Sequence, residues 1–157
     1  MTVKTTPENT SVYEKRTVMK TTMAKMLAFH EDPAAMPKLT PPPMIVRVKR
    51  DDRTALTEGE LDFTLWFGPV PIRWLARHEP GPTDTSFADR MIEGPMAYWR
   101  HEHIFEETPD GIALIDRVTL AHKPGWQGLL TRLMFDGVPL RILFFYRHMR
   151  TRQAVER

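Results

Sequence analysis

The sequence predicts an α+β protein in which a curved seven-stranded antiparallel sheet is wrapped around one long C-terminal helix. Residues 44–121 alternate between apolar and polar positions and are divided by turn-forming residues, as antiparallel strands are. After Pro124 and Gly125 the apolar spacing becomes helical. Since a sheet with one apolar face needs a cover, and only this last helix is long enough to supply it, the two should pack together around a cleft.

The N-terminal part of the chain should add one strand and two short helices. Residues 1–10 are polar and threonine-rich, which indicates a flexible tail before a single domain at 11–157. The next elements predicted are a strand at 11–20, a helix at 21–30 with a threonine cap, and a short helix at 34–39. Three consecutive prolines then end any helix and force an extended backbone.

The sheet continues through six more strands, separated by Gly- and Pro-containing turns. They are predicted at 44–49, 59–67, 72–79, 85–93, 97–106 and 112–121. The terminal helix should run from Trp126 to about Val155, and Gly137 and Pro139 should kink it or split it in two.

Composition excludes several classes of function. The 157 residues contain no cysteine, so disulfides, thiol nucleophiles, thiolate zinc sites and iron–sulfur clusters are ruled out. The net charge is only +2, and two groups of basic residues, at 4–25 and at 147–152, lie at opposite ends of the sequence, so no nucleic-acid partner is expected. No apolar run reaches the roughly 18 residues of a membrane span, and no phosphate-binding loop or Gly-x-Ser-x-Gly elbow occurs. We expect a cytoplasmic monomer or homodimer without a cofactor.

The most informative segment is the strand at 97–106. Because strand side chains alternate, Trp99, His101, His103 and Phe105 share one face. Each neighbouring strand contributes one acid to the same apolar face, Asp89 before it and Asp116 after it. Buried charge is normally paired or functional, so this row is the candidate site.

The row admits several interpretations, and the register that decides which acid meets which histidine is open. An Asp–His pair can satisfy buried polar groups, orient a ligand, or prepare an imidazole as a general base. The candidates for catalysis are therefore His101, His103, Asp116 and Asp89. A metal ion could be chelated by two histidines at i, i+2, but no further histidine stands at a recognisable interval, so no metal is predicted.

Aromatic and methionine side chains could line a cleft or simply fill a core. Arg147 on the terminal helix could point into the cleft, where a guanidinium would attract a carboxylate or enolate, or lie on the surface among His148, Arg150 and Arg152. Arg100, Glu102 and Arg117 fall on the strand face opposite the histidines and should form cross-strand pairs in solvent.

Several motifs carry a resemblance to a known family. They are Phe87-x-Asp89, Gly94-Pro95, Trp99-x-His101-x-His103-x-Phe105, Asp116-Arg117-Val118 and Tyr146-Arg147, with Phe29-His30, Leu39-Thr40-Pro41-Pro42 and Trp74 in addition. Together with the order of elements, they resemble the START/birch-pollen-allergen superfamily, also called SRPBCC, in its ligand-binding, polyketide cyclase/dehydrase-like branch. The resemblance covers about residues 11–150.

The resemblance implies a helix-grip fold, in which the sheet holds the terminal helix over an elongated cavity. It implies a protein that binds a small, largely apolar ligand, lipid-, aromatic- or polyketide-like; the alternative is a cyclase, dehydratase or isomerase that uses a His–Asp pair for proton transfer. It implies no shared catalytic residues, metal or cofactor. Lys123 and the Asp136–Pro139 interruption depart from the family pattern and predict a bent lid. The residues expected to bind the ligand are Trp66, Trp74, Phe87, Asp89, Met91, Trp99, His101, His103, Phe105, Asp116 and Arg147.

Overall fold

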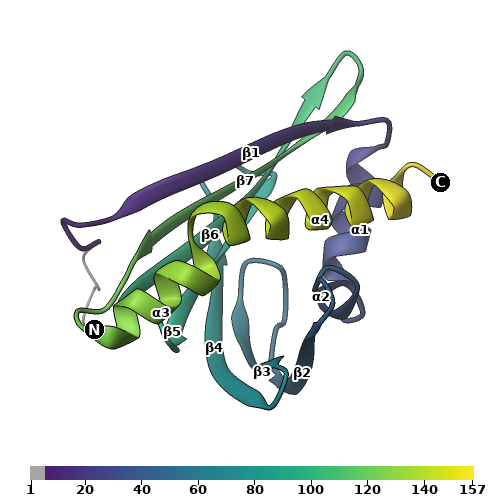
Figure 1. Ribbon diagram of the computed structural model, residues 1–157. Helices are drawn as coiled ribbons and strands as arrows, with labels where there is room; N and C mark the ends of the chain where they lie inside the picture. The colour runs from purple at the N-terminus through teal and green to yellow at the C-terminus, as the bar shows by residue number, and fades with distance from the viewer. Residues whose placement is uncertain (1–5) are drawn as a thin grey trace.

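One curved antiparallel sheet with a helical cover forms the molecule (Figure 1). The computed structural model describes residues 6–157. The strands are β1 (Ser11–Met19), β2 (Met44–Asp51), β3 (Gly59–Phe67), β4 (Val70–Pro80), β5 (Ser86–Glu93), β6 (Tyr98–Thr108) and β7 (Gly111–Ala121), in the spatial order β1-β7-β6-β5-β4-β3-β2. Every pair of neighbouring strands is joined by a hairpin except β1 and β7, which are the first and last strands along the chain.

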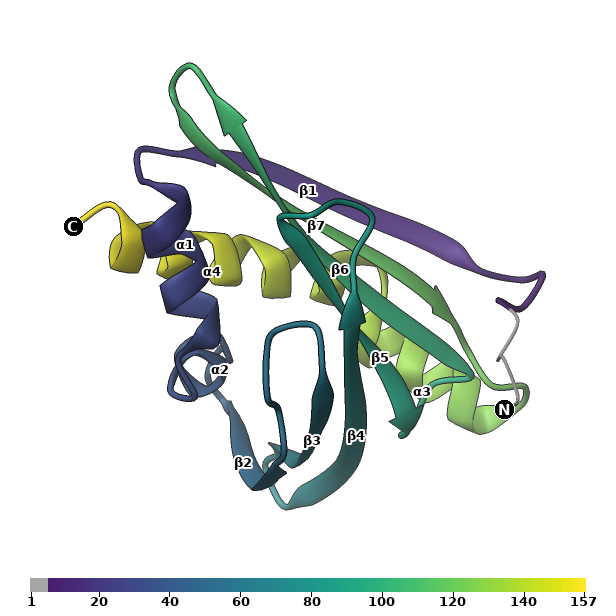
Figure 2. The same ribbon diagram turned by 180° about the vertical axis from the view of Figure 1, so that it is seen from behind.

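Four helices complete the fold: α1 (Met23–Glu31), α2 (Ala35–Lys38), α3 (Trp126–Phe135) and α4 (Gly137–Val155). Figure 1 shows α4 running across one face of the sheet, and Figure 2 shows the strands in front of it from the other side. The end of α4 lies beside α1, and α2 packs near β2. The predicted helix-grip arrangement is confirmed. Of the tail predicted at 1–10, residues 1–5 lie outside the described part of the chain, and residues 6–10 form no helix or strand.

The terminal helix is split at Asp136, as the sequence predicts. Asp136 has an extended backbone (φ −137°, ψ 169°) and its Oδ1 accepts a hydrogen bond from the Gly137 N–H at 2.8 Å. Its Oδ2 lies 2.7 Å from Nε2 of His122, which ties the break to the end of β7. Pro139 sits in the first turn of α4, where an N–H has no helical partner and its loss is tolerated. The cover is therefore two helices set at an angle.

The core consists of two apolar clusters on the helix side of the sheet. The larger one joins the sheet centre to α3 and α4 and includes Trp74, Trp99 and Phe144. The smaller one lies beneath α1 and includes Met26 and Phe105. Two separate clusters leave the space between the sheet centre and α4 incompletely filled, and that space is the site described below.

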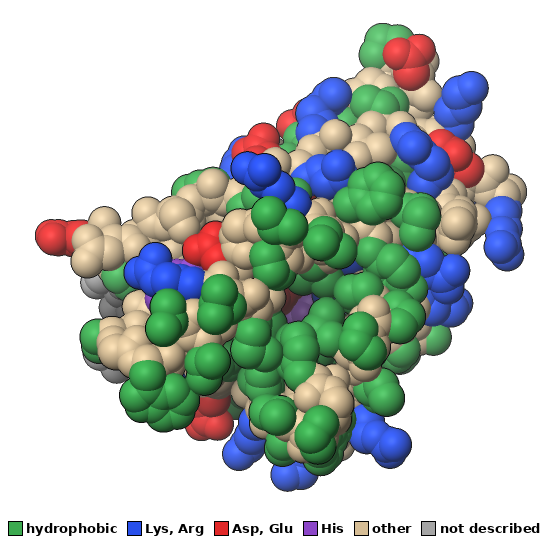
Figure 3. Space-filling model, viewed as in Figure 1, with side chains coloured by type: hydrophobic (Ala, Val, Ile, Leu, Met, Phe, Trp, Pro, Cys, Tyr) green, Lys and Arg blue, Asp and Glu red, His purple; other side chains and the backbone are tan. Residues whose placement is uncertain are grey.

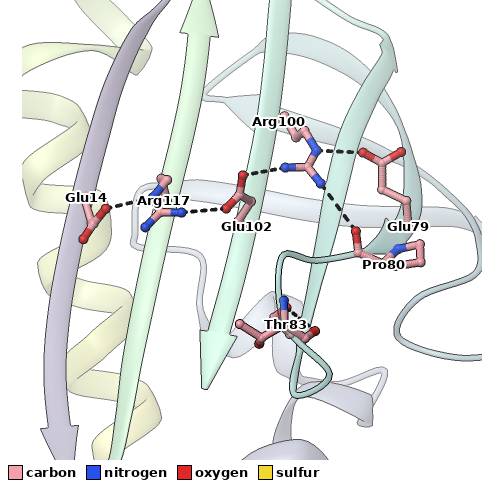
Figure 4. A network of polar contacts seen from close by, with 8 residues as sticks. Glu14, Glu79, Pro80, Thr83, Arg100, Glu102 and Arg117 are labelled. Carbon is pink, nitrogen blue, oxygen red and sulfur yellow. Dashed lines mark hydrogen bonds and ion pairs between the residues drawn. The ribbon is translucent and has the colours of Figure 1, made fainter. Parts of the chain in front are cut away.

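The opposite face of the sheet carries a charged chain across its strands (Figure 4). Arg117 on β7 donates to Glu14 on β1 at 2.8 Å and to Glu102 on β6 at 3.0 Å. Arg100 on β6 continues the chain, with Nε 2.8 Å from an oxygen of Glu79 on β4. Strand alternation predicted this face, because these side chains occupy the positions between the inward-facing ones.

No helix within residues 6–157 is long and apolar enough to cross a membrane.

Candidate functional site

A cavity of about 410 Å³ lies between the concave face of the sheet and the helices that cover it. Its walls come from α1, α2, the proline segment at 41–43, β2 to β6, α3 and α4. Apolar side chains such as Phe63, Trp74 and Leu143 make up most of the lining, while polar groups gather where β5 and β6 meet α4. The cavity therefore has an apolar body and one polar end.

Seven of the eleven side chains predicted to bind a ligand line this cavity. They are Trp74, Phe87, Asp89, Trp99, His101, His103 and Arg147. The remaining four do not: Met91 and Phe105 are packed into the core clusters, Asp116 lies outside the lining, and Trp66 alternates with Leu65 and Phe67, which both face the cavity. Strand alternation therefore puts Trp66 on the other side of β3.

The strand register brings the acids and histidines together in diagonal pairs. By backbone pairing, Asp89 is opposite His101, and His103 is opposite Asp116. The hydrogen bonds instead join His101 to Asp116 at 2.6 Å and His103 to Asp89 at 2.8 Å. Diagonal neighbours on a sheet are within reach of long side chains. The pairing left open by the sequence is thereby decided.

Asp116 is the centre of a buried hydrogen-bonded chain. Its Oδ1 accepts from His101 Nε2 and its Oδ2 accepts from His148 Nε2, both at 2.6 Å, and His148 Nδ1 lies 2.6 Å from the Thr17 hydroxyl. Burial alone would raise the pKa of Asp116, but the two imidazoles hold that pKa well below its ordinary value. Asp116 is therefore a carboxylate, and each imidazole places a hydrogen on Nε2 to donate to it.

The second pair differs from the first in its proton affinity. Burial and the nearby His101 lower the pKa of His103 to about 3, although its bond to Asp89 opposes the shift. Burial would raise the pKa of Asp89, but the hydrogen bond from His103 keeps that pKa below its ordinary value. His103 is thus a neutral imidazole donating Nε2–H to a carboxylate. At neutral pH it therefore donates to Asp89 and carries no second proton.

Four stacked rings run across β4, β5 and β6 at the polar end. His101 and His103 are 3.7 Å apart between ring centroids, His103 and Phe87 are 4.2 Å apart and almost parallel, and His78 follows Phe87 at 5.6 Å. The ring of His30 on α1 meets His103 edge-on at 5.9 Å. Stacking and edge contacts fix ring planes, so the imidazoles at the cavity wall are held in defined orientations.

Arg147 is the one arginine of α4 that lines the cavity. Its guanidinium lines the cavity, and its Nε is buried with no hydrogen-bond partner among the described residues. Burial lowers the pKa of Arg147, while the carboxylates of Asp116 and Asp89 oppose that shift. The ring of Phe144 lies 5.8 Å from its central carbon and supports it on one side. The side chain as a whole is half-buried, so the donor without a partner in residues 6–157 is the buried Nε.

Three further polar residues of the site were not among the predicted site residues. His148 was expected near surface arginines but is 3% exposed; it follows Leu140 and Phe144 at helical spacing, a signal that could have marked it as inward. His30 and His78 line the cavity, and each uses Nδ1 on a backbone carbonyl, of Met26 and Leu56 respectively. Donation from Nδ1 leaves Nε2 of each neutral ring as an acceptor.

Asp89, His101 and His103 also satisfy the spacing of a metal site, since one donor atom from each lies within 4.8 Å of the others. In this arrangement His103 Nε2 is already used by Asp89 at 2.8 Å, and His101 Nε2 by Asp116 at 2.6 Å. A metal ion would have to displace these bonds or use Nδ1. The geometry found here is that of hydrogen-bonded Asp–His pairs.

Comparisons with known proteins confirm the fold. No family model and no curated protein matches the sequence. The KanY protein has a TM-score of 0.69 at 11% identity, covering 95% of this chain and 99% of that one. A START superfamily protein from Mycobacterium smegmatis has a TM-score of 0.65 at 11% identity, covering 92% and 97%. The Zhui aromatase/cyclase from Streptomyces sp. R1128 has a TM-score of 0.63 at 13% identity, covering 94% and 92%. The fold is thus START-like and shared with polyketide aromatase/cyclases.

Proposed function

We propose that the protein binds one small, largely apolar molecule in the cavity and holds an acidic group of that molecule with Arg147. The supporting observation is the division of the cavity, about 410 Å³ in volume, into an apolar body and a polar end. Ligand pockets are commonly a few hundred cubic ångströms in volume, mostly apolar, with a few convergent polar groups. START-like neighbours share the architecture.

The apolar body suits a flat, unsaturated or ring-bearing ligand. Trp74 and Trp99 meet edge-on with centroids 5.4 Å apart, and Phe135 of α3 lies 5.8 Å from Trp74. Met36 and Met134 line the same space. Aromatic faces favour stacked rings, and methionine adapts to ligands of different shape.

The polar end suits an anion. Burying a charged group without a partner is costly, and a ligand carboxylate or enolate would supply the acceptor that Arg147 Nε does not have within the described residues. Asp89 and Asp116 are already occupied by histidines and do not pair directly with the guanidinium. The arginine is therefore held in position by its surroundings while its donors stay available.

A pair of fluorescent probes with the same rings tests both parts of this proposal. Anilinonaphthalene sulfonate carries an acid and N-phenylnaphthylamine does not. We expect saturable binding of both to the wild type, and a loss of about tenfold or more for the sulfonate alone in Arg147→Gln, as for one charged hydrogen bond. Arg150→Gln is the control, because Arg150 lies on the same helix but does not line the cavity, and it should change neither affinity.

Two outcomes would contradict the proposal. If Ala76→Leu, which fills the lining of β4, leaves both affinities unchanged, the probes do not enter the cavity. If Arg147→Gln weakens both probes equally, the guanidinium supports the structure and does not recognise the acid. Native mass spectrometry of the protein with a lipid extract provides a separate check, since a bound ligand should appear at a ratio of one.

A second candidate function is proton transfer by a cyclase, dehydratase or isomerase. His101 favours it, because Nε2–H is held by Asp116 at 2.6 Å while Nδ1 lies 3.8 Å from Asp89, beyond hydrogen-bond range. In the neutral ring Nδ1 is then a free acceptor at the cavity wall. It could take a proton from carbon beside a carbonyl, leaving an enolate next to Arg147, and return the proton to carbon afterwards.

Deuterium exchange into a cyclic β-diketone, followed by NMR, tests this mechanism. His101→Gln should abolish the protein-dependent exchange, whereas His103→Gln should retain most of it because His103 is a poor base. Equal rates in the wild type and His101→Gln would exclude His101 as the base.

A further inference from the structure

The outer side of α3 and α4 carries an apolar stripe that the fold does not cover. Its members recur every three or four residues, so they fall on one side of each helix. They are Trp126, Leu129, Leu130 and Leu133 on α3, and Val138, Ile142, Phe145 and Met149 on α4. Trp126, Leu133 and Phe145 are each more than 60% exposed, at 69%, 66% and 63%. We call this set the lid stripe.

Packing onto the sheet does not require the lid stripe. The core side of α4 is built by a different set, including Leu140, Phe144 and Val155, which are buried. The helix is therefore apolar on two sides. Exposed apolar patches of this extent usually mark a docking surface.

The lid stripe continues into the mouth of the cavity. Ile142 is 59% exposed and also lines the cavity, and its neighbours Pro139 and Leu143 line it as well. Figure 3 shows hydrophobic side chains around a hollow on this face, with histidine visible at its bottom. An apolar molecule that leaves the cavity here would meet the stripe before it met bulk water.

The unpaired charges beside the stripe are positive. Residues 126–155 contain five arginines and a single acid, Asp136; of the arginines, Arg147 lines the cavity and Arg152 lies 3.5 Å from Glu156. Asp136 is already used, since it caps Gly137 and pairs with His122. Lys15 of β1 places its ammonium 6.0 Å from the ring of Phe145. Arg132 and Arg141 are exposed beside the stripe and face no acid on their own helices.

We propose that the lid stripe docks onto an anionic lipid membrane with the cavity mouth turned toward the lipid. An apolar helix face bordered by arginines is the pattern of helices that lie in the membrane interface. A second copy of the chain would bring like charges together and seal the mouth, whereas an anionic bilayer is complementary to the arginines. The docking goes beyond ligand binding and needs no ligand to be present.

Sedimentation with vesicles tests the docking without any cavity ligand. We expect the wild type to bind vesicles of phosphatidylcholine mixed with phosphatidylglycerol, to bind pure phosphatidylcholine less, and to be released by salt. Leu133→Glu should reduce binding by at least about tenfold, since it removes one apolar contact and adds a negative charge. Val12→Glu is the matched control: Val12 is 63% exposed on β1, outside the stripe, and the variant should bind as the wild type does.

Two readouts distinguish the possible outcomes. Trp126 should shift its emission to the blue on mixed vesicles, and Trp126→Phe should remove that shift. Equal vesicle binding by the wild type and Leu133→Glu would overturn the proposal. The proposal would also be overturned if the wild type bound no vesicles and instead formed a dimer in analytical ultracentrifugation that Leu133→Glu dissociates. The stripe would then join two copies of the chain. Probe binding in the cavity can persist in either case, so failure here leaves the proposed function standing.

Discussion

Replacing Asp116 by asparagine should be the most damaging isosteric change to the polar site. The substitution keeps the shape of the side chain but turns one acceptor oxygen into an NH₂ donor. Asp116 is 4% exposed and accepts from His101 and His148 at 2.6 Å each. One of the two imidazole N–H groups would then face a donor, and the negative charge between the two rings would be gone.

The expected loss is set by the burial of these groups. Breaking a buried charged network by removing one partner costs about 3–5 kcal/mol. In a domain of this length each kcal/mol corresponds to roughly 2–4 °C in Tm, so Tm should fall by about 6–20 °C. Glu14→Gln is the control, because Glu14 is 46% exposed where it meets Arg117, and such pairs contribute about 0–1 kcal/mol.

Urea unfolding followed by circular dichroism measures the difference directly. A double-mutant cycle between Asp116→Asn and His148→Gln should give a coupling energy of at least about 1 kcal/mol, since the two side chains share one hydrogen bond. The reasoning is refuted if Asp116→Asn is within about 1 kcal/mol of Glu14→Gln, or if the cycle shows no coupling. Either result would mean that the chain through Asp116 adds nothing to the fold.

Three further predictions concern stability. The pKa of His103 is about 3 in the folded protein and about 6.5 when unfolded, so the unfolded state takes up the proton first as the pH is lowered. The free energy of unfolding should therefore decrease as the pH drops below 6.5, by about 2 kcal/mol between pH 7 and pH 5. Urea titrations at both pH values should show a smaller decrease in His103→Gln, and an equal decrease would contradict this assignment. Gly111→Ala should lower Tm more than Gly68→Ala, because both have positive φ but only at Gly111 would the new carbon meet a β1 carbonyl oxygen, at 2.1 Å. Phe144→Ala should cost about 3–5 kcal/mol, and the adjacent Phe145→Ala less than about 0.5, because the first is 0% and the second 63% exposed; similar values would show that the two sides of α4 are misassigned.

The architecture was predictable because alternation and turn residues mark each strand. The gap between Gly94 and Tyr98 separates β5 from β6, and alternation along β6 correctly placed Trp99, His101, His103 and Phe105 on the inner face. The break in the terminal helix followed from glycine and proline chemistry. These are local rules, and they operate within a few residues.

The rest of the site depends on contacts between distant elements. Two partners of Asp116 come from β6 and α4, and the sequence does not say which side of α4 faces the sheet, because both sides are apolar. His148 was therefore assigned to the surface group although it is buried. The diagonal pairing of His101 with Asp116 and of His103 with Asp89 could not be predicted from the sequence either. It depends on how far the side chains reach across strands whose register is set by whole hairpins.

The pairing of β1 with β7 has a consequence for the order of folding. All other neighbouring strands are joined by hairpins and can zip up one after another, but β1 must find β7 after about 100 residues of intervening chain. The link from Thr17 through His148 to Asp116 joins β1, α4 and β7. We expect refolding to end with a slow step in which these three segments dock. The hydrogen bonds that connect Thr17, His148 and Asp116 should therefore form only in this last step.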